Sequence, residues 1–213
     1  MINRNHPAPQ LKHLPTVYGF ATEHPLALSA SSSANQSSVT ETVALYTAFG
    51  DKRTLFRRAL EHYVEEKLRD KMARLEANLS PAQAITGFFD EVIERSLSDK
   101  LQRGCMLVNS ALEASPRDAE IQDTIARELK LIERFFKRCF VAGQTGGEIP
   151  ATHSAEDAAR HLLAVLLGLR VLARVRPERK LLMGAVRLAL AELDLLPLAK
   201  EAGAPAPAAR EKL

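Results

Sequence analysis

Four basic residues lie within seven positions of one another, directly after a glycine and an aspartate: Lys52, Arg53, Arg57 and Arg58. Gly50 permits a sharp turn and Asp51 can cap a new helix, so the first two basic residues would lie in the first helical turn. The exposed backbone N–H groups of such a turn, together with the positive end of the helix dipole, favour anions. The chemistry indicated is contact with phosphate.

The same charges also fit a solvated helix face balanced by Glu61, Glu65 and Glu66. The net charge of the 213 residues is only +3, so the total charge does not by itself indicate a nucleic-acid partner. The choice between these two interpretations depends on the surrounding sequence.

Helical periodicity extends through the chain from about Val39, and no segment shows the alternation of a convincing strand. Ser80, Pro81 and Gln83 have the order of a capping box at a helix start. Six helices are predicted, over residues 51–77, 80–98, 104–114, 115–142, 154–174 and 177–194. The sequence therefore predicts an all-α protein.

Residues 1–40 differ in composition, with two His-Pro pairs and six serines crowded between Ser29 and Ser38. This is typical of loops or disorder. The tail from Pro197 returns to Ala, Pro and charge. We expect an N-terminal segment over 1–50, a helical body over 51–196 and a flexible tail over 197–213.

The bulk composition, 46% hydrophobic and 26% charged, is that of an ordinary globular protein. No apolar run approaches the roughly 20 residues that span a bilayer, so no membrane partner is expected. Two cysteines, Cys105 and Cys139, do not make a disulfide framework. We expect the protein in the cytoplasm.

The segment Ala44–Phe56, ALYTAFGDKRTLF, resembles the TetR/AcrR family of bacterial transcription regulators. In that family such a stretch joins the recognition helix to the long helix that links a DNA-binding head to a ligand-binding body. The segment Arg103–Glu113, RGCMLVNSALE, is similar to a piece that borders the family's ligand cavity. The resemblance extends from about Ala44 to Leu196.

The resemblance implies a repressor with a small helix-turn-helix head, a helical-bundle body and double-stranded operator DNA as its partner. It assigns phosphate contact to Tyr46, Thr47 and Lys52, and places Thr40, Thr42 and Val43 at the positions that read bases. Residues 1–43 match the family less well, and Glu41 would face phosphates of like charge. Three interpretations of them stay open: a divergent working head, a lost head, or a start-site or reading-frame error.

The resemblance also implies a small-molecule inducer held by apolar walls with a few polar groups. The residues expected to line its cavity are Phe88, Phe89, Val92, Cys105, Val108, Asn109, Leu112, Phe135, Phe136 and Cys139. The alternative is that the phenylalanines are ordinary core. Cys105 lies near a helix N-terminus, where a thiol can become reactive, although a buried inert thiol is the simpler interpretation.

The last two long helices carry more apolar surface than one small body needs, and the family uses them as a homodimer interface. The alternative is that they are the central pair of the bundle. Small residues such as Ala159 and Gly168 allow close helix approach in either case.

No enzyme is expected, because the sequence has no HExxH, phosphate-loop or GxSxG pattern. The six histidines lack metal-ligand spacing, so neither a metal nor a cofactor is expected. His161, on a leucine-rich helix, is expected to be buried. The alternative to a DNA-binding repressor is a dimeric helical ligand-binding or interaction module that has lost DNA binding.

Overall fold

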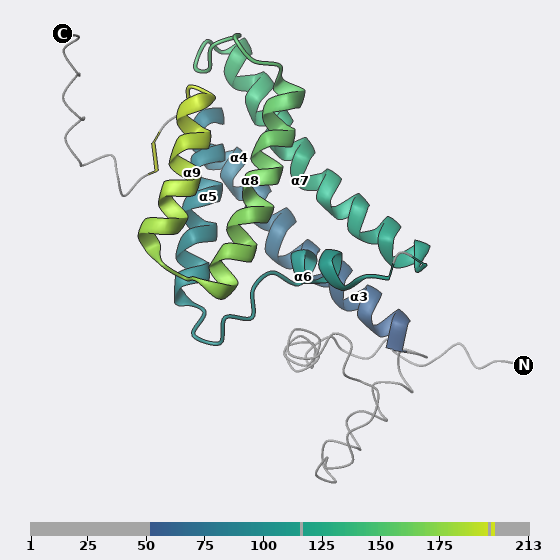
Figure 1. Cartoon of the computed structure of the whole chain (residues 1–213). Coiled ribbons are helices and arrows are strands. Elements are labelled where there is room, and N and C mark those ends of the chain that lie inside the picture. Colours follow the sequence, from purple (N-terminus) through teal and green to yellow (C-terminus); the bar gives the residue numbers. More distant parts are fainter. Residues whose placement is uncertain (1–51, 116, 196, 199–213) are drawn as a thin grey trace, which may run out of the picture. The chain divides into compact units, whose positions relative to one another are not determined.

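The computed structural model of the chain describes residues 52–115, 117–195, 197 and 198, and this part contains helices and no strands (Figure 1). The all-α prediction is confirmed, and each of the six predicted helices is present. The helical elements are α3 (Lys52–Val64), η2 (Glu65–Arg69), α4 (Asp70–Asn78), α5 (Pro81–Ser98), α6 (Met106–Glu113), α7 (Ala119–Thr145), α8 (Ala155–Val175) and α9 (Arg179–Glu192).

The predicted capping box begins α5. The Ser80 hydroxyl accepts a hydrogen bond from the Gln83 backbone N–H, and the Gln83 side chain accepts one from the Ser80 N–H. Ser154 caps α8 in the same way, by accepting from the Asp157 N–H. These caps satisfy backbone donors that the first turn leaves unpaired, so both helices begin where the sequence predicted.

The start of α7 differs from the prediction, which opened this helix at Ser115. The Asp118 carboxylate accepts from the Ile121 backbone N–H at 3.1 Å, and α7 begins at Ala119. The Ser115 hydroxyl instead accepts from Arg117 within the preceding turn. Serine and aspartate are N-cap residues of similar strength, so local preference alone does not distinguish Ser115 from Asp118.

The predicted first helix is interrupted by the π-helical turn η2, where the Asp70 N–H donates to the Glu65 carbonyl. None of the η2 residues is buried, and Leu68 is only half-buried. A π turn contains one more residue than an α turn, so it rotates the following residues out of the 3.6-residue register. The buried stripe resumes at Met72 and Leu75 in α4.

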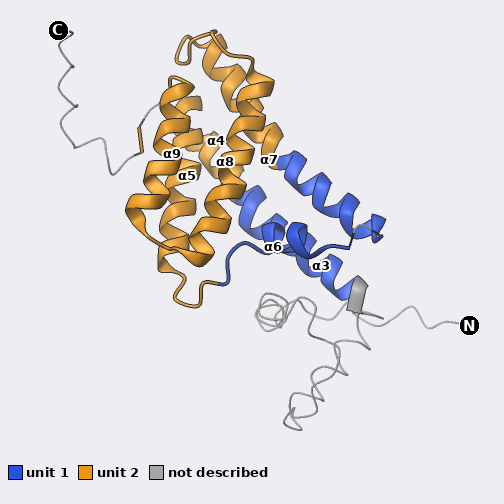
Figure 2. Ribbon diagram, in the orientation of Figure 1, with its two compact units in different colours: residues 1–70, 103–131 blue, residues 71–102, 132–213 orange. Residues whose placement is uncertain are grey.

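The chain forms two compact units (Figure 2). The described part of unit 1 is residues 52–70 and 103–131, and that of unit 2 is residues 71–102, 132–195, 197 and 198. The unit boundary therefore falls inside two helical stretches, at the end of η2 and within α7. The sequence-based division near residue 51 lies at the edge of the described residues and stays a prediction.

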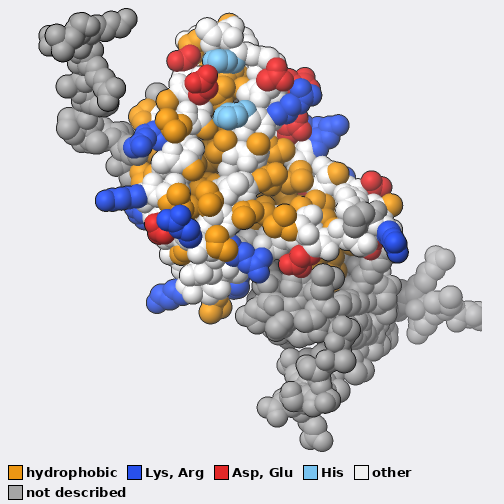
Figure 3. Space-filling view, viewed as in Figure 1, with side chains coloured by type: hydrophobic (Ala, Val, Ile, Leu, Met, Phe, Trp, Pro, Cys, Tyr) orange, Lys and Arg blue, Asp and Glu red, His pale blue; other side chains and the backbone are white. Residues whose placement is uncertain are grey.

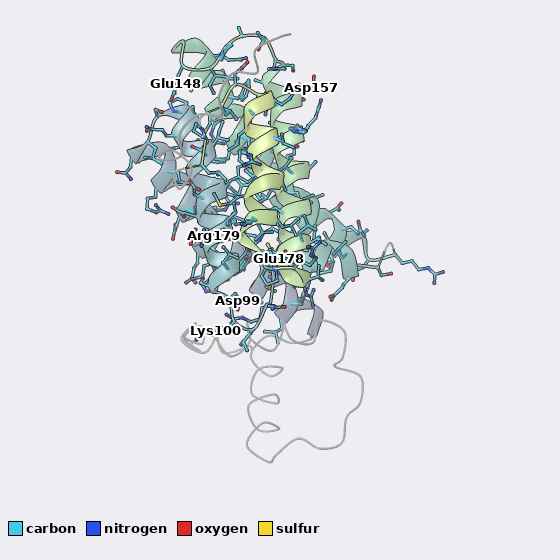
Figure 4. All side chains as sticks on the ribbon, turned by 60° about the vertical axis from the view of Figure 1, so that its left-hand side comes forward. Asp99, Lys100, Glu148, Asp157, Glu178 and Arg179 are labelled. Atoms are coloured by element: carbon cyan, nitrogen blue, oxygen red, sulfur yellow. The ribbon has the colours of Figure 1, made fainter. Side chains whose placement is uncertain are left out.

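In unit 2, α8 packs against α9, and α5 packs against both. Polar contacts add to the apolar packing: Arg170 of α8 donates to the Ser96 hydroxyl of α5 at 2.9 Å, and Arg179 of α9 pairs with Glu94 of α5. Glu148 and Asp157 lie at one end of this unit, and Asp99 and Lys100 at the other (Figure 4).

The turn after α7 folds back onto the start of α5. The backbone N–H groups of Glu148 and Ile149 both donate to the Gly143 carbonyl, and Gly147 takes a positive φ of 73° that suits glycine. The Glu148 carboxylate accepts from the Ser80 hydroxyl and, at 3.2 Å, from the Ala82 N–H. The predicted helices over 115–142 and 154–174 are separated in the structure as expected, although α7 continues past Ala142 to Thr145.

In unit 1, α3 packs against α6. Three ion pairs join α3 and η2 to the first half of α7: Arg57 with Glu120 at 3.3 Å, Glu61 with Arg127 at 3.8 Å, and Arg69 with Glu128 at 3.8 Å. These pairs connect the helical elements of unit 1 through charged groups, as the pairs of Arg138 with Glu76 and Arg160 with Glu133 do in unit 2.

Gly143 is the glycine whose replacement tests the turn. A Cβ at this position would lie 2.5 Å from Ile149 Cδ1 and 2.7 Å from its Cγ1, and Ile149 is buried. Although Gly→Ala usually stabilises a helix by about 0.5–1 kcal/mol, we expect Gly143→Ala to lower the free energy of unfolding by about 1–2 kcal/mol through overpacking. Urea unfolding measures this change.

The control is the same substitution in an Ile149→Ala background, which removes the atoms that clash. There we expect Gly143→Ala to become stabilising, as it is in an ordinary helix. An equal destabilisation in both backgrounds would show that Ile149 is not the cause.

Candidate functional site

The ten residues predicted to border a ligand cavity fall into two groups. One belongs to unit 2 and comes from α5 and α7: Phe88, Phe89, Val92, Phe135, Phe136 and Cys139. The other belongs to unit 1 and comes from α6 and the residue before it: Cys105, Val108, Asn109 and Leu112. Each group is described within its own unit.

The four phenylalanines of unit 2 form one buried cluster. Phe88 lies 5.4 Å from Phe135 and 5.3 Å from Phe136 between ring centroids, and Phe89 stacks on Phe136 at 5.6 Å. All four side chains are fully buried. Aromatic pairs at these separations contribute about 0.5–1.5 kcal/mol each beyond their area burial, so the rings act as core. Contact between these rings and a ligand stays a prediction.

Lys71 is a polar group at the edge of this cluster that the sequence interpretation missed. Its Nζ lies 4.6 Å from the centroid of the Phe88 ring, 3.5 Å from the Phe88 carbonyl oxygen and 3.5 Å from Glu91. Burial lowers the pKa of Lys71 to about 8; Glu91 opposes the shift, whereas Arg170 and Arg95 add to it. The sequence feature that could have identified Lys71 is its spacing of four residues from Leu75, because residues four apart are neighbours on a helix and Leu75 is buried.

Cys139 borders a small hollow on unit 2. Its volume is about 220 Å³, and its lining consists of Glu76, Leu79, Pro81, Ala84, Arg138, Cys139 and Ala142. Arg138 and Glu76 form a two-pronged ion pair there, with N–O distances of 3.0 Å. Burial, with a contribution from Glu76, raises the pKa of the Cys139 thiol to about 12. The thiol is therefore a poor nucleophile at neutral pH.

The unit 1 group centres on the start of α6. Cys105 is 6% exposed, and its sulfur lies 3.5 Å from the Tyr63 hydroxyl of α3. Asn109 is also buried and donates to the Arg103 carbonyl at 2.9 Å, which fixes the segment that leads into the helix. Leu112 differs from its neighbours because it is 69% exposed. It lies on the outer face of α6, so we leave it out of the proposed ligand-binding set.

Glu128 is a second residue that the sequence interpretation missed. It is 4% exposed, on the buried face of α7 with Ile121, Thr124 and Ile125. Its Oε2 has no hydrogen-bond donor in the described part of the chain. A buried acceptor without a donor costs about 1–3 kcal/mol, so the position is not explained by stability. The spacing of three and four from its buried neighbours was the signal that could have identified it.

The residues assigned to base readout and to two phosphate contacts lie outside the described residues: Thr40, Thr42, Val43, Tyr46 and Thr47. Lys52 is the first residue of α3, and the first turn of this helix contains no acidic residue. This composition agrees with the anion-binding helix start expected from the sequence.

The expectation that His161 is buried is wrong, because its side chain lies on an exposed position of α8. The helix has apolar residues on both faces, so composition did not distinguish the outer face from the inner one. Within the described residues, no group of His, Cys, Asp and Glu is arranged to hold a metal ion, and no helix has the length and apolar character to cross a membrane.

Comparison with known proteins identifies the body of this chain. Residues 81–189 match the family model described as "Tetracyclin repressor-like, C-terminal domain". The sequence is 32% identical to the HTH-type transcriptional regulator YezE of Bacillus subtilis (strain 168) over 152 residues, which is 71% of this chain and 78% of that protein. The chain belongs to the TetR family of transcriptional regulators. The resemblance predicted from the sequence is confirmed.

Further relatives of this TetR-family chain include the HTH-type transcriptional repressor ComR of Escherichia coli (strain K12). ComR is 26% identical over 131 residues, which is 61% of this chain and 62% of ComR. A solved structure of the TetR family regulator CifR, as a cysteine mutant complexed with 26-bp double-strand operator DNA, matches with a TM-score of 0.65 and 30% identity. The match covers 75% of this chain and 86% of that one.

The two thiols of this TetR-family chain give a test of the choice between sensing and inert cysteine. Because Cys139 has a pKa of about 12, only roughly one thiol in 10⁴ is ionised at pH 8. We expect iodoacetamide to leave both Cys139 and the buried Cys105 unmodified in the native protein, and to label both in guanidinium chloride. Intact-mass measurement follows the reaction.

Single Cys105→Ser and Cys139→Ser variants assign any label to its site. Rapid labelling of Cys105 in the native protein, accompanied by loss of DNA binding, would contradict the inert interpretation and favour sensing.

Proposed function

We propose that this chain is a DNA-binding transcriptional repressor that a small molecule releases from its operator. The observation that carries the proposal is its similarity to YezE over most of that protein's length, together with its similarity to CifR, which was solved on operator DNA. These relatives are named as regulators rather than enzymes, which supports a function without catalysis, carried out in the cytoplasm.

The start of α3 supports a role in phosphate contact. Lys52 and Arg53 occupy its first turn, where the helix dipole and exposed backbone N–H groups favour anions, and the first turn itself contains no acidic residue. Tyr46 and Thr47, with Thr40, Thr42 and Val43 for base readout, complete the proposed DNA-binding set. Residues 1–50 would supply the helix-turn-helix, whose second helix lies in the major groove.

We further propose that the ligand is bound by the body, where the buried residues Cys105 and Val108 of unit 1 supply apolar walls and Asn109 of the same unit supplies a polar group. The ligand would favour a conformation with lower DNA affinity, and the coupling free energy between two such sites is typically about 1–3 kcal/mol. An inducer of this strength weakens operator binding by about 5-fold to 150-fold.

The outer face of α8 and α9 supports a homodimer through these two helices. Exposed and half-buried positions there form a stripe of small and apolar residues: Ala164, Gly168, Val171, Val175, Leu181, Gly184, Ala185 and Leu188. Hydrophobic side chains gather over these helices on the face shown in Figure 3. Leu188 is 73% exposed in the single chain, and burial against a second copy removes such surface from water.

The DNA proposal is tested by titrating the full-length chain against DNA from upstream of its own gene, at two salt concentrations with excess competitor DNA. We expect binding that survives the competitor and weakens with salt. Lys52→Ala should lower affinity for all sequences about equally and reduce the salt slope by about 1, because one phosphate contact is lost.

The control variant is Lys67→Ala, which removes an exposed lysine of η2 and should leave the slope unchanged. An unchanged slope in Lys52→Ala would show that Lys52 does not contact phosphate. No DNA binding by a folded, dimeric chain would favour the module that has lost its DNA function.

The dimer proposal is tested with Leu188→Glu, which places a charge in the proposed interface. We expect sedimentation equilibrium to show at least a tenfold weaker dimer, because an unpaired buried carboxylate is costly. The matched control is Leu112→Glu, an exposed leucine on α6 that should leave association unchanged. A mass of 23.4 kDa for the unmodified chain at micromolar concentration would overturn the dimer.

A further inference from the structure

A glutamate occupies a core position in the first half of α7. Buried residues there recur at intervals of three and four, and Glu128 follows Ile121, Thr124 and Ile125 in that series. Its side chain is 5% exposed. Charged side chains reach this degree of burial almost only when they are paired or have a functional role, so the partners of this carboxylate decide its meaning.

The protein partners of Glu128 do not satisfy it. Its Oε1 accepts a long hydrogen bond of 3.4 Å from Arg127 Nε, the neighbouring residue. Its Oε2 lies 3.8 Å from a guanidinium nitrogen of Arg69, which is beyond hydrogen-bond distance. Within the described residues Oε2 accepts no hydrogen bond, so one strong acceptor is left open in the interior of unit 1.

Both arginines near Glu128 are shared with other carboxylates. Arg69 pairs with Glu65 at 2.7 Å, and Arg127 lies 3.8 Å from Glu61. Together with Glu128, these residues form a cluster of three carboxylates and two guanidinium ions. The net charge of the cluster is therefore −1 (2 − 3). Arg57 and Glu120, which extend the cluster through Glu61, add one charge of each sign and leave this balance unchanged.

An open acceptor with excess negative charge fits a donor that brings a positive charge. Buried apolar side chains of the same unit, including Ile121 and Ile125 on the same face of α7, suit a hydrocarbon part. We infer that Glu128 is the anchoring acceptor for the ammonium group of a small amphiphilic organic amine, bound in unit 1. This inference rests on the proposed function, since it names the chemical class of the regulator's ligand. Asn109 and the Tyr63 hydroxyl are further polar groups of the unit interior.

The test uses the full-length protein and three probes with the same carbon chain: n-hexylammonium, n-hexanol and hexanoate. Isothermal titration calorimetry at pH 7 and fixed salt measures the dissociation constant of each. We expect n-hexylammonium to bind with a stoichiometry of one per chain and at least tenfold more tightly than the other two, because it alone supplies a charged donor to Oε2.

The variant Glu128→Gln keeps the shape of the side chain and removes its charge. We expect it to weaken n-hexylammonium binding at least tenfold and to leave n-hexanol binding within twofold. The matched control is Asp123→Asn, which removes an exposed carboxylate from the same helix and unit and should leave all three affinities unchanged.

If n-hexylammonium binds the unmodified chain and Glu128→Gln with equal affinity, the inference is overturned. This holds even if the variant unfolds at a lower temperature, because a loss of stability without a loss of affinity would mean that Glu128 forms only a structural ion pair. Failure of n-hexylammonium to bind more tightly than n-hexanol to the unmodified chain would also overturn it, and this outcome does not depend on whether the variant folds. The titration against operator DNA is carried out without any of the three probes. A result that overturns the amine inference can therefore be distinguished from one that overturns the DNA-binding proposal.

Discussion

The contact between four phenylalanine rings of α5 and α7 is the interaction on which unit 2 depends. Each helix supplies two adjacent phenylalanines, Phe88 with Phe89 and Phe135 with Phe136, and all four are fully buried. Adjacent residues point about 100° apart on a helix, so both rings of a pair are buried only if the helix presents a wide apolar face. The low-dielectric environment of this cluster extends to Lys71 above Phe88, where it disfavours the ammonium form.

Unit 1 contains a buried carboxylate among its ion pairs. Ion pairs join α3 and η2 to α7, and exposed pairs of this kind contribute little to stability, about 0–1 kcal/mol each. Glu128 is the exception among them because it is buried with an open acceptor, an arrangement that costs free energy in the absence of a further donor. A polar interior that is not selected for stability is what a specific ligand site requires, and the open acceptor of Glu128 motivates placing the polar end of a ligand in unit 1.

The position of η2 connects the two proposals. A continuous helical stretch runs from Lys52, proposed to contact phosphate, to the α4 residues of unit 2, and the π turn interrupts it at Glu65–Arg69. π turns are uncommon and occur frequently at functional positions. A guanidinium nitrogen of Arg69, the last residue of this turn, lies 3.8 Å from the open oxygen of Glu128. In the proposed binding mode, an ammonium group at Glu128 competes with Arg69, so a ligand would act directly on the irregular part of the helix that leads to DNA.

The sequence by itself determined the helical class, the helix starts at Ser80 and Ser154, and the family, because caps and the 3.6-residue periodicity are local properties that one helix expresses without its neighbours. It did not determine the π turn η2, the exposure of His161 and Leu112, or the burial of Glu128 and Lys71. Burial of these side chains depends on which faces meet after the helices pack, and a charged residue on an apolar stripe is assigned to solvent by composition alone. Only the tertiary structure decided which of these charges lost contact with water, and therefore which of them are candidates for a functional role.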